Sequence, residues 1–478
     1  MYLGVNFALF TPAIVCEVMI IEAAWPAFLT LILFALLMIP IVIRFLKRRF
    51  DLFETAIWVI IIYSWCYVLR PAYMIITHTG HMYLSLDETE RDRLLVLALG
   101  YSILGIIFFF AGYRLPLCKL ISRRLPYPAP LWDKRAANIV VFLFTIVGAA
   151  ASIIYINANG GFIFYVTHIN WFRGESLNIR LAFLAWGFDL FPIASCILLL
   201  TVLYSRRQLA LYTLIFIAYI FGCTIMLSLL GGRALVVSYW LMAALLFHYS
   251  KRQLRLSYIL LVLPLIFLYI AVGGLIREQL FSVPDRNIST LPEIFLRVSF
   301  LAESMFGKFV NSPDADAMDV FMALLRGVPS EFPFQYGKQF LDLLKALVPA
   351  GLLPVSRESF RVYLLGEQIR NVWWPWYGGG TPPSILGFLY LNFHIFGIAI
   401  GMFILGLFSK IVYSYFRHNH ENKGVMLFYS LTLFQFIIGM IRGGDLVNVG
   451  HGYIIKFLFT LVALRLITHG RFIRRRLL

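Results

Sequence analysis

Stretches of about 20 consecutive apolar residues recur along this chain, and their length restricts the fold more than any other feature of the sequence. Such a stretch is long enough to cross the hydrocarbon core of a bilayer as a helix. Lipid offers the backbone no hydrogen-bond partners, so a spanning segment has to be a helix or part of a closed β-barrel. Barrel strands would alternate apolar and polar residues, which these runs do not do. We therefore predict an all-α, polytopic membrane protein.

The composition excludes a soluble enzyme. Of the 478 residues, 61% are apolar and only 14% are charged, whereas about a quarter of the residues are charged in ordinary soluble domains. The five cysteines occur singly, without a CxxC pair, and are interpreted as packing residues.

We predict eleven membrane spans. The first 22 residues are also apolar, but Glu17 and Glu22 argue against both a further span and a cleavable signal peptide, so the number of spans is eleven or twelve. The eleven candidate spans are residues 25–46, 55–76, 94–115, 137–157, 181–205, 208–230, 232–250, 256–276, 383–408, 424–441 and 452–469.

Basic residues cluster in the short loops on one side of these spans. Such a bias marks the cytoplasmic face of a membrane protein, and it accounts for about half of the 41 Lys and Arg residues. The net charge of +17 is therefore interpreted as attraction to anionic lipid, and no nucleic-acid motif accompanies it. The clusters are 44–49, 119–135, 206–207, 251–255, 410–423 and 471–476.

The opposite face is predicted to carry one large extracytoplasmic domain. Residues 277–381 contain eight prolines between amphipathic stretches, so we expect short helices lying over the mouth of the bundle. This divides the chain into N-terminal spans (1–276), the loop domain (277–381) and C-terminal spans with a basic tail (382–478). No internal repeat is visible, which argues against a repeat-built transporter.

Two glycine-flanked arginines are predicted at the outer ends of spans. Arg233 follows Gly231-Gly232, and Arg442 precedes Gly443-Gly444-Asp445. Glycine permits tight turns and close approach of a ligand, and a guanidinium binds phosphate oxygens in a bidentate manner. The alternative is that each arginine only caps a span end and reaches toward the interface.

Other arginines and aromatic residues lie in the predicted outer loops. Arg173, beside Glu175, and Arg277 are further candidates for binding phosphate, and aromatic rings near Arg370 could stack on sugar rings or anchor the interface. The candidate glycan-binding residues are Tyr336, Arg370, Trp373, Trp374, Trp376 and Tyr377.

Weaker signals concern metals and buried charges. Asp314-Ala315-Asp316 resembles a metal-binding DxD sequence but also suits a helix start, and His78 and His81 near Asp87 could hold a divalent ion. Asp189 lies inside a predicted span, as a paired structural acid or a proton carrier, and Lys456 lies nearer a span end. No nucleotide-binding or serine-hydrolase motif is present. We predict no metal and no cofactor.

The chain resembles the O-antigen polymerase family (Wzy type, oligosaccharide repeat-unit polymerases). The resemblance rests on three motif regions and on the two arginine turns described above. These regions are Gln335-Tyr336-Gly337, the two Pro-containing segments at 347–349 and 353–354, and the stretch 379–393 (GGTPPSILGFLYLNF) followed by Gly397 and Gly401-Met402-Phe403.

The resemblance implies an enzyme of the bacterial inner membrane that uses no nucleotide sugar. Members transfer a growing glycan from undecaprenyl diphosphate to the non-reducing end of a new lipid-linked repeat unit, on the periplasmic face. The resemblance assigns Arg233 and Arg442 to the donor diphosphate. A flippase and a chain-length regulator are the partners it suggests.

The reaction also needs a base to accept the proton of the acceptor hydroxyl. His451 is the first candidate, with Glu175 and Asp445 as alternatives, and a purely structural His451 remains a competing interpretation. Two other functions stay open: an O-antigen ligase, which joins a finished chain to the lipid core, and a flippase of lipid-linked oligosaccharides, which would carry ionisable residues along a central cavity.

Overall fold

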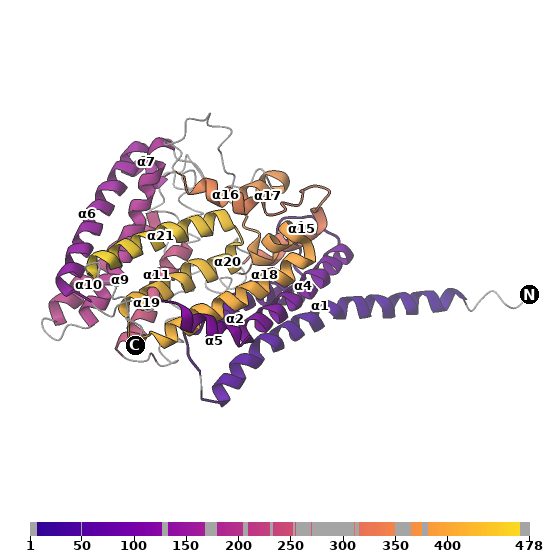
Figure 1. Cartoon of the computed structure of the whole chain (residues 1–478). Coiled ribbons are helices and arrows are strands. Elements are labelled where there is room, and N and C mark those ends of the chain that lie inside the picture. Colours follow the sequence, from indigo (N-terminus) through magenta and orange to yellow (C-terminus); the bar gives the residue numbers. More distant parts are fainter. Residues whose placement is uncertain are drawn as a thin grey trace, which may run out of the picture.

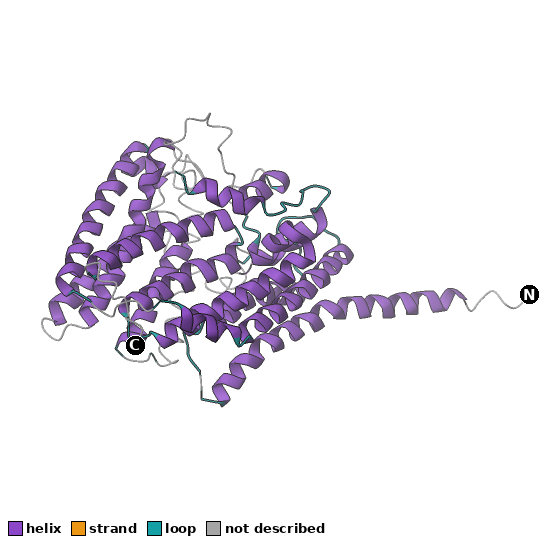
Figure 2. Ribbon diagram, in the orientation of Figure 1, coloured by secondary structure: helices purple, strands orange, loops and turns teal. Residues whose placement is uncertain are grey.

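The computed structural model describes residues 7–48, 50–126, 132–167, 179–203, 209–229, 233–251, 315–348, 365–374 and 381–468, together with the single residues 254, 269 and 310. In these ranges every regular element is a helix (Figure 2). The prediction of an all-α membrane bundle is confirmed.

Eight helical segments in the described residues are long and apolar enough to cross a membrane, and each coincides with a predicted span. Two of them join several helices end to end: α2 (Thr55–Ser64), η1 (Trp65–Leu69) and α3 (Arg70–Thr77), and α19 (Lys423–Leu431), η5 (Thr432–Ile437) and α20 (Ile438–Gly443). The others are α1 (Phe7–Leu46) from Ala24 on, α4 (Glu88–Arg114), α6 (Lys134–Ala158), η2 (Ile179–Trp186) with α9 (Gly187–Leu203), counted from Phe183, α18 (Ser384–His418) and α21 (Leu446–Ile467).

The remaining predicted spans differ in outcome. Helices α10 (Leu209–Leu229) and α11 (Arg233–Ser250) occupy two of them, whereas 256–276 lies outside the described residues apart from Tyr269. The first residues form no separate span in the described range, because α1 continues from Phe7 to Leu46 without a turn. In Figure 1 this long helix projects from the bundle toward the N-terminus.

The helices run alternately between two ends of the bundle. One end, which we call the basic end, carries Arg44, the short helix α5 (Leu117–Arg124) and the start of α6. The other, which we call the α15 end, carries α15 (Ala317–Gly327), α16 (Lys338–Ala346) and α17 (Leu365–Trp373), which gather on one side in Figure 1.

Glycines bring neighbouring helices into backbone contact. A Cβ on Gly112 of α4 would overlap the Phe403 carbonyl of α18, and one on Gly406 of α18 would overlap the Phe109 carbonyl of α4. Small residues allow this close approach, which compensates for the absence of a hydrophobic driving force between helices in lipid. The α4–α18 pair is consequently a rigid support for the α15 end.

Helix α18 is broken near its start. Phe393 and His394 have non-helical dihedral angles, and the φ of His394 is 55°. Residues eight positions apart would be separated by about 12 Å in a continuous helix, yet a Cβ on Gly397 would overlap the Leu389 carbonyl. The predicted span at 383–408 is therefore two helical pieces joined by a sharp kink.

Among the helices that the structure describes in the predicted loop domain, α15 differs from the expected interfacial helix. Its residues from Ala317 to Leu324 are all buried, and they share one hydrophobic core with α2, α4 and α18. By contrast, α16 exposes Phe340, Leu341 and Leu344. The α15 segment therefore packs into the bundle rather than lying over it.

Candidate functional site

The turn after α20 fits tightly against the start of α18. Gly444 has a φ of 60°, in the left-handed region that glycine adopts without strain. A Cβ at this position would overlap the carbonyl oxygen of Ser384. The second glycine of the Arg-Gly-Gly-Asp sequence is therefore required by both the turn and its neighbour.

Asp445 caps two helices at once. One carboxylate oxygen accepts the backbone N–H of Asn448 at 3.0 Å, at the start of α21, and the other accepts the N–H of Leu365 at 2.9 Å, at the start of α17. Burial raises the pKa of this carboxyl above its ordinary value, although the backbone N–H groups oppose the shift. Asp445 thus fixes α17 against the turn that contains Arg442.

Arg442 lies in the last turn of α20 and is half-buried. It is close enough to Cys66 of η1 to interact electrostatically with the thiol, and Asp316, before α15, acts on the same thiol. The turn that contains Arg442 and the segment before α15 therefore both lie in the neighbourhood of η1.

Arg233 begins α11, at the same end of the bundle as Arg442. α11 packs antiparallel against the helix that ends at Arg442, and Ser238 donates a hydrogen bond to the Phe434 carbonyl at 3.4 Å. From this contact, the first residues of α11 and the last residues of α20 both extend toward the α15 end. Arg233 and Arg442 therefore lie at the ends of two neighbouring helices, on the same side of the bundle.

A buried ion pair joins α3 to α15. Arg70 is 1% exposed, and its Nε and Nη2 atoms donate to the two carboxylate oxygens of Asp319, at 2.8 and 3.2 Å. Asp319, itself 0% exposed, also accepts the backbone N–H of Met82 at 2.8 Å. Sequence analysis missed this pair, although an arginine and an aspartate among apolar residues were the available signal.

The loop before α4 closes over this ion pair. His81 Nδ1 accepts the backbone N–H groups of Tyr83 and Leu84, both at 3.0 Å, so the proton is on Nε2, which donates to the Asp319 carbonyl at 2.7 Å. Burial lowers the pKa of His81. The 3.9 Å between His81 Nδ1 and the Asp319 carboxylate is therefore not an ion pair, because the ring is neutral.

Tyr83, in the same loop, forms hydrogen bonds with both Asp316 and Trp374. The Tyr83 hydroxyl donates to Asp316 at 2.5 Å, and Trp374 donates its indole N–H to the Tyr83 carbonyl at 3.1 Å. Trp374 is only 2% exposed, and its hydrogen bond holds the end of α17 against the loop.

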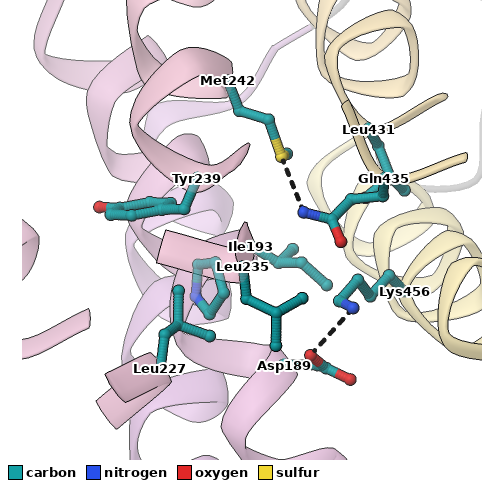
Figure 3. A pocket seen from close by; sticks show the side chains of 10 residues that line it. Asp189, Ile193, Leu227, Leu235, Tyr239, Met242, Leu431, Gln435 and Lys456 are labelled. Carbon is teal, nitrogen blue, oxygen red and sulfur yellow. Dashed lines mark hydrogen bonds and ion pairs between the residues drawn. The ribbon is translucent and has the colours of Figure 1, made fainter. Parts of the chain in front are cut away.

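A small, mostly apolar cavity lies deeper, between α9, α10, α11, α19, η5 and α21 (Figure 3). Lys456 Nζ lies 3.3 Å from Asp189, and both side chains are largely buried. Gln435 points toward the same space from η5. Asp189 is therefore paired, and the cavity has room for about one water molecule.

His451 lies one turn above this pair on α21. Its ring centroid is 5.6 Å from that of Trp186, and it interacts electrostatically with both Asp189 and Lys456. Its buried Nε2 atom has no hydrogen-bond partner among the described residues. This imidazole nitrogen therefore retains its capacity to bind or move a proton.

The other predicted site residues are distributed as follows. Tyr336 is 74% exposed beside α16, and Arg370 and Trp373 are half-buried on α17. The positions of Arg173, Glu175, Arg277, Trp376, Tyr377 and Asp314 lie outside the described residues. Within the described ranges, no cluster of three or more His, Cys, Asp or Glu side chains is suited to hold a metal ion.

The eight long apolar helices in the described residues define a multi-pass membrane protein. The model of a family described as "Putative O-antigen polymerase" matches residues 370–449. The matched segment runs from the end of α17 through α18 to the Arg-Gly-Gly-Asp turn and the start of α21. No curated protein and no solved structure matches the chain.

Proposed function

We propose that this protein polymerises oligosaccharide repeat units carried on undecaprenyl diphosphate, at the α15 end of the bundle. One observation carries the proposal: the O-antigen polymerase match includes the turn at Arg442, which the fold holds in place through Gly444 and Asp445. The active face is the periplasmic side of the bacterial inner membrane, with the basic end in the cytoplasm.

The reaction is a glycosyl transfer between two lipid-linked substrates. An acceptor hydroxyl oxygen bonds to the anomeric carbon of the growing chain, and the bond from that carbon to the lipid diphosphate breaks. Arg442 and Arg233 bind the diphosphate and stabilise the charge that develops on it. Arg173 and Arg277 are further candidates for the same role. The proposal includes no metal ion in this step.

His451 accepts the proton of the acceptor hydroxyl in this scheme. Its unpartnered Nε2 atom supports the role, since a base needs a nitrogen that is not already occupied. Asp445 is the less suitable alternative because its two oxygens already accept backbone N–H groups. Glu175 remains the other alternative.

The sugar portion of the substrate would contact the aromatic residues around α16 and α17. Tyr336 supports this part of the proposal by its exposure, with the half-buried Trp373 and Arg370 and with Trp376 and Tyr377 as additional candidates. A flippase that delivers repeat units and a chain-length regulator are the proposed partners.

The decisive experiment separates polymerase, ligase and flippase. In a deletion strain, loss of a polymerase leaves single repeat units on the lipid core, whereas loss of a ligase leaves long unattached chains. The purified protein should elongate lipid-linked repeat units in detergent without ATP, an ion gradient or added metal. Failure of the purified protein to elongate them, combined with long unattached chains in the deletion strain, would contradict the proposal.

Substitutions test the two proposed roles separately: diphosphate binding by Arg442 and proton acceptance by His451. We expect Arg442→Ala to abolish long chains and Arg442→Lys to restore them only weakly, because lysine lacks the bidentate guanidinium. His451→Ala should lower elongation by about 10²–10⁴-fold, the usual contribution of a general base. Wild-type ladders at normal protein levels would remove the residue concerned from the site.

A further inference from the structure

An open groove lies at the basic end, far along the chain from every residue of the proposed active site. It runs between the C-terminal turns of α1 and α4 and has a volume of about 140 Å³. Six residues line it: Pro40, Ile43, Arg44, Phe110, Tyr113 and Arg114.

The groove combines cationic and apolar walls in a fixed order. Arg44 and Arg114 lie in the last turns of their helices, whereas Pro40 and Phe110 lie about one turn further into the spans. The guanidinium groups are thus at the level of the membrane surface, and the apolar side chains are at the level of the acyl chains.

Part of the positive charge in the groove is not neutralised. Arg44 Nη2 donates to Glu54 at 2.8 Å, and Glu54 also accepts the Tyr113 hydroxyl at 2.7 Å. Arg44 Nη1 is buried and has no acceptor among the described residues. Arg114, which is exposed, has no ion pair in the same ranges.

A further cation reinforces the excess of positive charge. Lys410 Nζ, on α18, lies 4.8 Å from the centre of the Tyr113 ring. Glu54 is the carboxylate paired in this cluster, so three cations face one anion. This net positive charge favours an anionic ligand.

We propose that this groove binds one anionic glycerophospholipid, with its phosphate between Arg44 and Arg114 and an acyl chain along Pro40, Ile43 and Phe110. The neighbouring surface of α1 supports a lipid as the source of the phosphate. Ile39, Val42, Phe45 and Leu46 of this helix all expose large apolar side chains, which suits contact with surrounding acyl chains. A soluble phosphate would use only the cationic end.

The test measures lipid binding to the purified full chain by native mass spectrometry. Phosphatidylglycerol is the probe, with phosphatidylethanolamine, glycerol 3-phosphate and inorganic phosphate as comparisons. We expect selective retention of phosphatidylglycerol. We also expect Arg114→Gln to weaken it about fivefold, the effect of one basic residue near a membrane surface.

Two further variants make the result specific to the groove. Ile43→Trp fills the apolar end without changing charge and should also weaken phosphatidylglycerol binding. Arg123→Gln removes an exposed charge at the same end, outside the groove, and should bind as the wild type does. Equal binding by all variants, or equal retention of phosphatidylethanolamine, would overturn the proposal. Saturation of the groove by inorganic phosphate would overturn the lipid as its ligand.

Discussion

At the scale of single residues, the Arg70–Asp319 ion pair lies where α15 joins the bundle. Its two side chains are fully buried and exchange two hydrogen bonds. Removing one partner leaves an uncompensated buried charge. We therefore expect Arg70→Ala or Asp319→Ala to lower the free energy of unfolding by about 3–5 kcal/mol, measured by denaturant titration in detergent.

A matched control is available on the same helix. Arg326 of α15 lies 2.9 Å from Glu90, but these side chains are 41% and 38% exposed. Arg326→Ala should therefore cost at most about 1 kcal/mol. Similar losses for Arg70→Ala and Arg326→Ala would contradict the importance of burial at this junction.

His81 gives the same junction a dependence on pH. Burial lowers its pKa in the folded protein, against the opposing carboxylate of Asp319 and together with the charges of Arg70 and Arg326. Below the ordinary histidine pKa, about 6.5, the unfolded chain gains a proton that the folded chain does not gain. Stability should thus be fully present above this pH and fall as the pH decreases below it.

The measurement is the midpoint of thermal unfolding in detergent between pH 5 and pH 8. His81→Asn keeps an acceptor near the Nδ1 position but does not titrate, so its midpoint should fall less than that of the wild type over the acidic part of this range. Parallel curves for the two proteins would show that His81 is not the group responsible.

Sequence reasoning identified some residues of this region but not their partners. Arg70 and Asp319 are separated by 249 positions, and no periodicity of a single chain pairs residues so far apart. His81 was interpreted as a potential metal ligand, because its residue type is visible while the two N–H groups that occupy its Nδ1 atom are not. The turn glycines were predictable because Gly-Gly beside a charged residue has few other uses.

At the scale of elements, the turn between α20 and α21 can be tested through its two glycines. Gly444→Ala should be strongly destabilising, because its φ is positive and its Cβ would overlap Ser384. Gly443→Ala is the matched control, since its Cβ would meet only a Val449 methyl group at 3.5 Å, an ordinary contact.

We expect the Gly444→Ala protein to lose long polysaccharide chains and Gly443→Ala to keep them, as read from gel ladders at equal protein levels. The proposed reason is displacement of Arg442 from the donor diphosphate. Long chains in both strains would mean that the geometry of this turn does not control polymerisation.

Helix pairing shows where sequence patterns stop being informative. Span boundaries were predictable because apolar length is a local property, and eight spans agree with the structure. The break at Phe393 and His394 was not predicted, since neither residue is a proline or glycine. The break brings Gly397 against the Leu389 backbone, a contact that a residue-by-residue hydropathy pattern does not contain.

At the scale of the whole molecule, the separation of a basic end from an α15 end leads to a prediction of orientation. Positively charged short loops remain in the cytoplasm, so Lys47 should lie inside and Tyr336 outside the inner membrane. Cys66, Cys118, Cys196 and Cys223 are buried, and the remaining cysteine, Cys16, is replaced by Ser in the parent protein, so a membrane-impermeant maleimide should give little background in that parent.

Two single-cysteine additions measure this orientation directly. Both Lys47 and Tyr336 are exposed, so Lys47→Cys and Tyr336→Cys should react equally once the membrane is permeabilised. In intact spheroplasts we expect the maleimide to label Tyr336→Cys alone, because the bilayer protects the basic end. Labelling of Lys47→Cys instead would reverse the topology and place the Arg442 turn in the cytoplasm. A transfer between lipid-linked glycans on the periplasmic face would then be impossible at this site.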